Sequence, residues 1–251
     1  GLTPAPVSTQ ILQRDRHAQA LAVLAIVGGS LEKLATEIRH LQKTETLEVE
    51  EPFSEGQTGS SAMPHKRNPV NCERVAGLAR VLRGNALAAL ENIALWHERD
   101  ITHSSVERVI IPDSFILTHF MFSEMIAVIR GLQVYPDNMR ENIWKTRGLI
   151  FSQRALLALI DKGLSREAAY KIIQKNAMKV WKDIQSPDGL RKGGRDGRNK
   201  LRPYIDLKDL LFQEKDVMKH FSKKEIEALF DLDYHLKHIN TIFKRVLAKE
   251  C

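Results

Sequence analysis

A short segment between two long helical patterns reads GQTGSSAMPHKRNP (residues 56–69). It has no apolar periodicity, and it combines two adjacent serines with a Met-Pro pair, a lysine and an asparagine. Flexible linkers are usually built from glycine, serine and charge without such a pattern. The segment therefore predicts a loop with a function of its own, held between two helices.

The residues before this segment predict a long helix that begins near Ser8, whose hydroxyl is a good N-cap. Its apolar residues step by three and four, so one seam stays apolar for about five turns. Gly28 and Gly29 lie inside the helix, where each costs about 1 kcal/mol relative to alanine. We therefore expect another helix to approach closely there. The seam consists of Leu24, Val27, Leu31, Leu34, Ile38 and Leu41.

Two more long helices are predicted after the segment. Asn68 and Pro69 supply a cap and a first-turn proline for a helix that reaches about Trp96. A third helix runs from about 105 to 130, with a kink at Pro112. The apolar positions are Val75, Leu78, Leu82, Leu87 and Leu90 in the first of these, and Phe115, Phe122, Met125 and Ile129 in the second. Three such helices without a period-two strand pattern predict an elongated, all-α bundle.

The chain changes character after Gly131, where the predicted helices are shorter. We place a boundary before Gly148, which gives a central helical domain at 1–147 and a small helical C-terminal domain at 148–251. The shorter helices are expected at about 137–146, 149–161, 165–185, 222–230 and 234–248. The segment 186–204 is basic, and in 191–200 five of ten residues are Lys or Arg. We interpret it as a solvated loop, although a role in covering a site or binding a protein stays open.

The composition is that of a globular protein, with 43% hydrophobic and 27% charged residues among 251. The net charge of +7 suits an anionic partner. Aromatic residues make up only 6% and do not interleave with the basic run, so nucleic-acid binding is not expected. The longest apolar run, at 20–29, is about half of a membrane span. Two cysteines fit a reducing compartment, and we expect a cytoplasmic protein without a membrane segment or a metal site.

The stretch GSSAMPHKRNP (59–69) closely resembles the signature of the fumarase/aspartase superfamily of lyases. Three other stretches resemble adenylosuccinate lyases of the bacterial type: STQILQRDRHA (8–18), ERDITHSSVER (98–108) and GLIFSQRALLALIDKGLSREAAY (148–170). The resemblance implies long helices that form a common core in a homotetramer with shared active sites. It implies elimination of fumarate from adenylosuccinate to give AMP, and from succinyl-aminoimidazole carboxamide ribotide, in purine biosynthesis. No cofactor is implied.

The chemistry of such a reaction explains the residue types in the signature. Removing a proton beside a carboxylate creates an enolate-like anion, so the site needs a base and preorganised positive groups. By resemblance the base is Ser60, Lys66 supplies positive charge, and Asn68 supplies hydrogen bonds to the substrate carboxylate. Glu73 is expected to orient a catalytic histidine of a neighbouring subunit, although a first-turn acid also suits a helix dipole.

Substrate contacts are expected on several segments. The ERDITHSSVER stretch brings guanidinium and hydroxyl donors together, which suits a phosphate. The resemblance assigns nucleotide binding there to Arg99, Ser104 and Arg108. It also assigns substrate contacts to Gln10 and Met63, whereas Arg74 is either a substrate ligand or a surface residue.

The resemblance also has a gap. The general-acid histidine of the family belongs to a region upstream of the first long helix, and this sequence begins after it. We therefore expect the chain to be the C-terminal portion of a lyase and to be inactive or severely impaired by itself. The alternatives are another superfamily enzyme, such as a carboxymuconate cycloisomerase, and a non-catalytic helical assembly or nucleic-acid-binding module.

Overall fold

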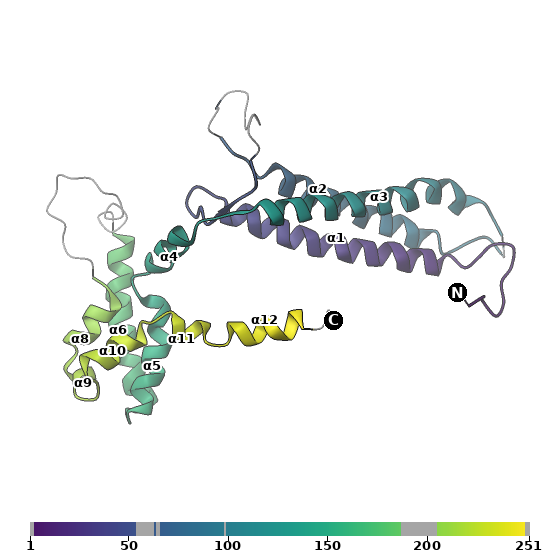
Figure 1. The fold of residues 1–251 in the computed structure, drawn as a ribbon. Coiled ribbons are helices and arrows are strands. Elements are labelled where there is room, and N and C mark those ends of the chain that lie inside the picture. The colour runs from purple at the N-terminus through teal and green to yellow at the C-terminus, as the bar shows by residue number, and fades with distance from the viewer. Residues whose placement is uncertain (1–2, 54–62, 64–65, 98, 187–204, 249–251) are drawn as a thin grey trace. The chain divides into compact units, whose positions relative to one another are not determined.

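The chain consists of two compact units in a computed structural model that describes residues 3–53, 63, 66–97, 99–186 and 205–248. Unit 1 is Gly1–Met139 and unit 2 is Arg140–Cys251. Helices make up nearly all of the regular structure, as Figure 1 shows, which confirms the all-α fold. The domain boundary expected between 147 and 148 stays a prediction.

Unit 1 is a bundle of three long helices, α1 (Asp15–Leu41), α2 (Val70–Glu91) and α3 (Thr102–Gly131). One two-stranded antiparallel pairing joins β1 (Val49–Glu50) to β2 (Gln133–Val134). It ties the segment after α1 to the end of α3. The strands were not predicted, because two residues are too short to show a period of two.

The predicted start of the first helix is wrong. The helix begins at Asp15, after the residue Arg14, and its N-cap makes no side-chain hydrogen bond. Ser8 lies in an exposed segment outside it. The second helix ends at Glu91 rather than near Trp96, and the third begins at Thr102, slightly before its expected start.

The contact between α1 and α2 depends on small residues. A Cβ atom added to Gly28 would lie 2.7 Å from Leu82 Cδ1, whereas one added to Gly29 would meet nothing within 4 Å. The expected close approach is therefore confirmed at Gly28 alone. Its neighbours in this contact include the buried Ala79 and Leu82.

The outer surface of unit 1 carries many exposed apolar side chains. The predicted stripe on the third helix is buried only at Met125, while Phe115, Phe122 and Ile129 are about half exposed. Leu34, expected in the seam of α1, is also exposed. Among the described helices, α3 alone is long and apolar enough, by length and composition, to cross a membrane, a test that core helices of soluble proteins also pass. The sequence analysis expected no membrane segment because it considered only the apolar run at residues 20–29, and it overlooked α3.

Unit 2 is built from short helices around its own core. They are α4 (Pro136–Trp144, which begins in unit 1), the 3-10 helix η1 (Leu149–Phe151), α5 (Ser152–Asp161), α6 (Arg166–Gln185), α8 (Leu207–Gln213), α9 (Lys215–Met218), α10 (Lys223–Leu229), α11 (Asp233–Leu236) and α12 (Ile239–Leu247). Helices α8 and α9 were not predicted, and the helix expected at 234–248 is divided into α11 and α12. Most of the basic segment, residues 187–204, lies outside the described residues.

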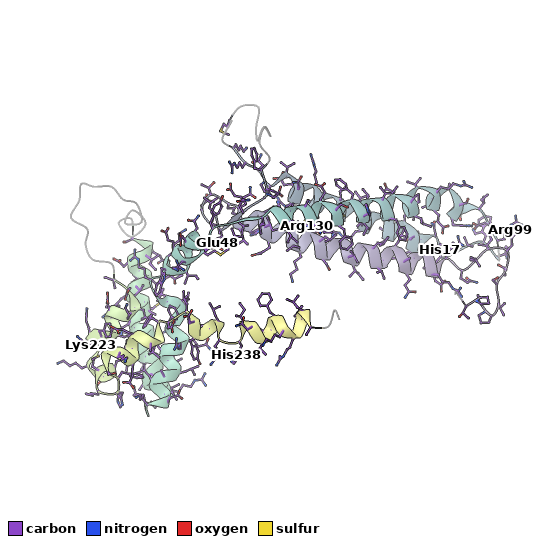
Figure 2. All side chains as sticks on the ribbon, viewed as in Figure 1. His17, Glu48, Arg99, Arg130, Lys223 and His238 are labelled. Atoms are coloured by element: carbon purple, nitrogen blue, oxygen red, sulfur yellow. The ribbon has the colours of Figure 1, made fainter. Side chains whose placement is uncertain are left out.

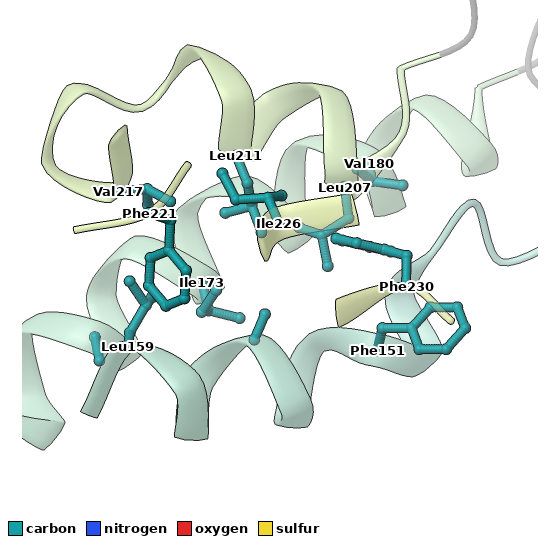
Figure 3. Close-up of a cluster of buried hydrophobic side chains, with 12 residues drawn as sticks. Phe151, Leu159, Ile173, Val180, Leu207, Leu211, Val217, Phe221, Ile226 and Phe230 are labelled. Atoms are coloured by element: carbon teal, nitrogen blue, oxygen red, sulfur yellow. The ribbon is translucent and has the colours of Figure 1, made fainter. Parts of the chain in front are cut away.

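The core of unit 2 is an apolar cluster between α5, α6 and the helices that follow (Figure 3). The rings of Phe151 and Phe230 meet edge to face, with centroids 5.4 Å apart. Gly148 precedes Phe151 with φ of +82°, and an added Cβ would lie 3.0 Å from the Phe230 ring. Glycine is therefore required at this position both by the backbone conformation and by the approach of the ring.

The two adjacent glycines of α1 provide a matched test of helix packing. We expect Gly28→Leu to lower the free energy of unfolding by about 2 kcal/mol, because the added side chain overpacks the contact with Leu82. Gly29→Leu should raise it by about 0.5–1 kcal/mol, because leucine is the better helix former and open space surrounds Gly29. Urea denaturation followed by circular dichroism measures both, and equal effects would contradict this packing.

The start of α10 provides a test of pH dependence. Lys162 donates to Glu225 over 2.7 Å, and the Ser222 amide and hydroxyl donate to the same carboxylate, which lowers the pKa of Glu225 to about 2. A depressed pKa stabilises the folded state above the ordinary value of 4.5, and this stabilisation is lost as the pH falls toward 2. We therefore expect Glu225→Gln to destabilise unit 2 at neutral pH and to have a shrinking effect in acid. Glu227→Gln, at an exposed position of the same helix, is the control and should show no such trend.

Candidate active site

The predicted site residues fall into two groups at opposite ends of unit 1. Lys66, Asn68, Glu73 and Arg74 lie at or just before the start of α2. The other group lies near the starts of α1 and α3 and consists of Gln10, Arg99, Ser104 and Arg108. Figure 2 shows Arg99 and His17 at one end of the bundle, and Glu48 and Arg130 toward the other.

The length of α2 sets the separation of the two groups. The helix has 22 residues, and a rise of 1.5 Å per residue makes it about 33 Å long. A substrate of ordinary size cannot touch both ends of one bundle. A single copy of the chain therefore does not bring the predicted residues together.

The signature end presents charged side chains to the outside. Lys66, Glu73 and Arg74 are exposed, and Met63 is exposed as well. The side chain of Asn68 is half-buried and makes no hydrogen bond to a described residue. Ser60, the predicted base, lies outside the described residues.

The cap of α2 comes from a residue that the sequence analysis missed. The helix has Pro69 at its N-cap and no side-chain cap there, so the prediction that Asn68 caps it is wrong. Instead, the Glu51 carboxylate accepts hydrogen bonds from the Asn71 amide at 3.2 Å and the Cys72 amide at 2.7 Å. No local pattern could identify this cap, because Glu51 is about twenty residues upstream of its partners.

Further contacts fix the backbone around the signature segment. Gln42, just after α1, accepts from the Glu51 amide at 3.0 Å and donates to the Arg67 carbonyl at 3.3 Å. The Arg67 guanidinium lies 4.8 Å from the centre of the Phe53 ring. The segments on both sides of residues 54–65 are thus attached to the end of α1 and to each other.

Two side chains at this end have raised pKa values. The Tyr135 hydroxyl donates to the Glu50 carboxylate, and this hydrogen bond raises the pKa of Tyr135. Burial, followed by the hydrogen bond and charge of Glu51, raises the pKa of the Cys72 thiol. Cys72 therefore stays protonated at neutral pH and acts as a small apolar residue of the core.

The other end of the bundle contains a cavity of about 650 Å³. Ser104 and Arg108 both line it, one helical turn apart in α3, together with Arg14 and His103. Gln10 and Arg99 are exposed and are not among the described residues that line it. The structure therefore brings together two of the four residues predicted at this end.

An ion pair holds one wall of this cavity. Arg14 donates to the Glu107 carboxylate over 2.7 Å, and both side chains are largely buried, with 10% and 14% exposed. Arg14 also donates to the Leu12 carbonyl at 2.9 Å. The sequence analysis did not single out either residue. Because Glu107 neutralises Arg14, the unpaired positive charge among the described residues that line the cavity comes from Arg108.

A carboxylate also caps α3. Asp100 accepts from the Thr102 hydroxyl and amide and from the Trp96 amide, and these hydrogen bonds lower the pKa of Asp100. The start of α3 thus has a hydroxyl and an arginine, donors that suit a phosphate, while Asp100 occupies the first backbone amide of the helix. Across the described ranges, no three His, Cys, Asp or Glu side chains are placed to hold a metal ion.

Comparison with known proteins gives two family matches. The family described as adenylosuccinate lyase C-terminus matches residues 148–246, and the family described as lyase matches residues 1–84. The adenylosuccinate lyase of Thermotoga maritima is 49% identical over 245 residues, and that of Bacillus subtilis is 47% identical over 246. Both alignments cover 98% of this chain and 52% of the relative. The chain thus spans about half the length of these curated relatives.

Solved structures show the same kind of fold at lower identity. A fumarate lyase from Mesorhizobium sp. BNC1 has a TM-score of 0.76 and 27% identity, covering 94% of this chain and 47% of that protein. The 3-carboxy-cis,cis-muconate lactonizing enzyme of Pseudomonas putida has a TM-score of 0.75 and 25% identity, with the same coverage. Over nearly its whole length the chain is therefore similar to adenylosuccinate lyases, and it corresponds to the C-terminal part of these relatives.

Proposed function

We propose that this chain is part of an enzyme that eliminates fumarate from adenylosuccinate to give AMP, and from succinyl-aminoimidazole carboxamide ribotide. The relatives at 47–50% identity are named adenylosuccinate lyase. In this proposal the chain supplies the base and the phosphate contacts of a cytoplasmic enzyme of purine biosynthesis. The general acid comes from the upstream half that the relatives carry.

The separation of the two residue groups carries the proposal. Each group is incomplete in the roles that the resemblance assigns, since the base is expected at one end and the nucleotide-phosphate contacts at the other. The groups lie about 33 Å apart in one bundle. A complete site therefore forms where the signature end of one copy meets the cavity end of another, as in a homotetramer with shared active sites.

The surface of the bundle supports this association. Apolar side chains are exposed along all three helices, and an apolar patch of this extent usually marks a contact surface. Copies that pack side by side through these faces would bring opposite ends of different bundles together. The exposed residues include Val23 and Ile26 of α1, Val81 and Leu87 of α2, and Val109, Phe115, Ile116, Phe122, Ile126 and Ile129 of α3.

Each group has a defined task in the reaction. Ser60 removes the proton beside the substrate carboxylate, while Lys66 and Asn68 stabilise the anion that forms. Glu73 orients a histidine of a neighbouring copy. At the other end, Ser104 and Arg108 bind the nucleotide phosphate.

Peripheral contacts complete the proposed site. Arg99 and Gln10 extend the substrate contacts at the cavity end, and Met63 and Arg74 extend them at the signature end. All four side chains are exposed. In a single copy of the chain they are thus accessible to a substrate that a second copy would also contact.

The cavity argues against the alternative superfamily activity. A carboxymuconate cycloisomerase acts on a small acid without a phosphate, and such a substrate has no use for the Ser104–Arg108 pair. The muconate enzyme of known structure is also only 25% identical, against 47–50% for the adenylosuccinate lyases. A purely structural module would not require the Ser, Lys and Asn of the signature.

Activity in a mixed assembly tests the proposed base. The chain is combined with a full-length relative in which alanine replaces the serine that matches Ser60, and fumarate release is followed by ultraviolet absorbance. We expect turnover in the mixture and none with the chain alone. Ser60→Ala in this chain should lower the rate of the mixture by about 10²–10⁴-fold, whereas the control Ser61→Ala should retain more activity. A mixture that assembles but stays inactive would disprove the proposed division of labour.

Binding of AMP to the chain tests the phosphate contacts separately. We expect Arg108→Gln to weaken binding about ten- to a hundredfold, because a charged hydrogen bond to phosphate contributes about 1.5–3 kcal/mol. Ser104→Ala should have a smaller effect in the same direction. Isothermal titration calorimetry measures both, with Arg166→Gln at an exposed position of α6 as the control. If Arg166→Gln weakened AMP binding as much as Arg108→Gln does, the effect on affinity would come from the net charge of the chain and not from a binding site.

A further inference from the structure

The sequence at the start of α2 is suited to cap itself, yet the structure uses a different cap. Asn68 followed by Pro69 is a typical pair of N-cap and first helical residue. In the structure, the Asn71 amide, which Asn68 would bind as the N-cap, donates instead to Glu51, and the next amide, that of Cys72, donates to the same carboxylate. The Asn68 side chain is left without a hydrogen bond to a described residue.

Glu51 can hold this place because its own position is fixed. Glu51 is only 7% exposed, and its backbone amide donates a hydrogen bond to the side chain of Gln42 just after α1. A buried carboxylate forms stronger hydrogen bonds to amides than a neutral side-chain oxygen does. It also interacts favourably with the positive end of the helix dipole. Glu51 therefore outcompetes Asn68 for the Asn71 amide.

We infer that Glu51 is a positioning residue of the active site, which caps α2 in place of Asn68 and thereby keeps the Asn68 amide available to the substrate. The same cap fixes the first turn of α2, which carries Glu73 and Arg74. The role of the freed amide rests on the proposed function. The competition between Glu51 and Asn68 for the helix does not, and it can be tested without any turnover.

The competition predicts a specific pattern of amide hydrogen exchange at Asn71, the amide that both side chains can bind. With Glu51 present, Asn68→Ala should change the exchange of this amide less than about twofold, since Asn68 is not the cap. Glu51→Ala should accelerate it about fivefold, because Asn68 then takes over as a weaker cap. The double variant should accelerate exchange by more than the product of the two single effects, that is, by well over about tenfold relative to the wild type. Glu37→Ala, at an exposed acid of α1, is the control.

Two results of the exchange experiment would overturn the inference. One is acceleration by Asn68→Ala in the presence of Glu51, which would make Asn68 the cap in solution. The other is a double variant equal to the product of the single effects, which would mean that the two side chains do not compete. Glu51→Gln keeps the volume and one acceptor oxygen, and it replaces the alanine variant if that variant does not fold.

The mixed assembly tests the consequence for catalysis. We expect Glu51→Ala to lower kcat about tenfold with a smaller change in KM, because the redirected Asn68 amide no longer stabilises the developing anion. Glu51→Gln should recover part of the loss, and Glu37→Ala should have no effect. An unchanged kcat in Glu51→Ala would refute the positioning role. A mixture without any turnover would count against the proposed function, and the exchange pattern would then decide the inference alone.

Discussion

The length of the three helices in unit 1 is the constraint on which the rest of the molecule depends. A helix cannot shorten without losing hydrogen bonds, so α2 holds its two ends about 33 Å apart. The predicted signature residues lie at one end and the cavity lies at the other. The bundle is therefore a spacer as much as a core, and the proposed chemistry requires neighbouring copies. Apolar side chains stay exposed on the outside of the bundle, because a three-helix bundle buries only one stripe of each helix.

The sequence predicted the helices because their apolar period is long and regular, and it failed where the decisive contact is distant. The start of α1 was misplaced because Ser8 is a good cap by type but makes no cap in the structure. Phe115 and Phe122 were assigned to the core because periodicity reports an apolar face without reporting what covers it. Ser222 and Glu225, by contrast, form a capping box that depends only on residues three apart, and this start was predicted close to its position.

The candidate site shows the same division between local and distant effects. Ser104 and Arg108 are four residues apart in a helix, so the sequence was sufficient to place them near each other, and the cavity confirms it. Arg14 and Glu107 are 93 residues apart, and Glu51 lies about twenty residues from the amides it binds. Nothing in a single sequence connects such partners. The roles of Ser60 and its neighbours came from the resemblance and stay predictions, because the chain alone does not assemble the site.

Both ends of the bundle share one electrostatic arrangement. Glu51 occupies amides at the start of α2, and Asp100 occupies the first amide of α3, so an acidic residue upstream uses the backbone donors of each helix. At the cavity, Glu107 neutralises Arg14 in addition. In the proposed site, an anionic substrate at either end is then bound by side chains such as Lys66 and Arg108, which form no ion pair with another residue that the structure describes. Side chains can be placed on different copies and directed toward a shared substrate, whereas backbone amides at a helix start point only along their own axis. Capping from upstream thus rigidifies the scaffold and, in the proposed assembly, leaves the recognition of the substrate to side chains that several copies supply together.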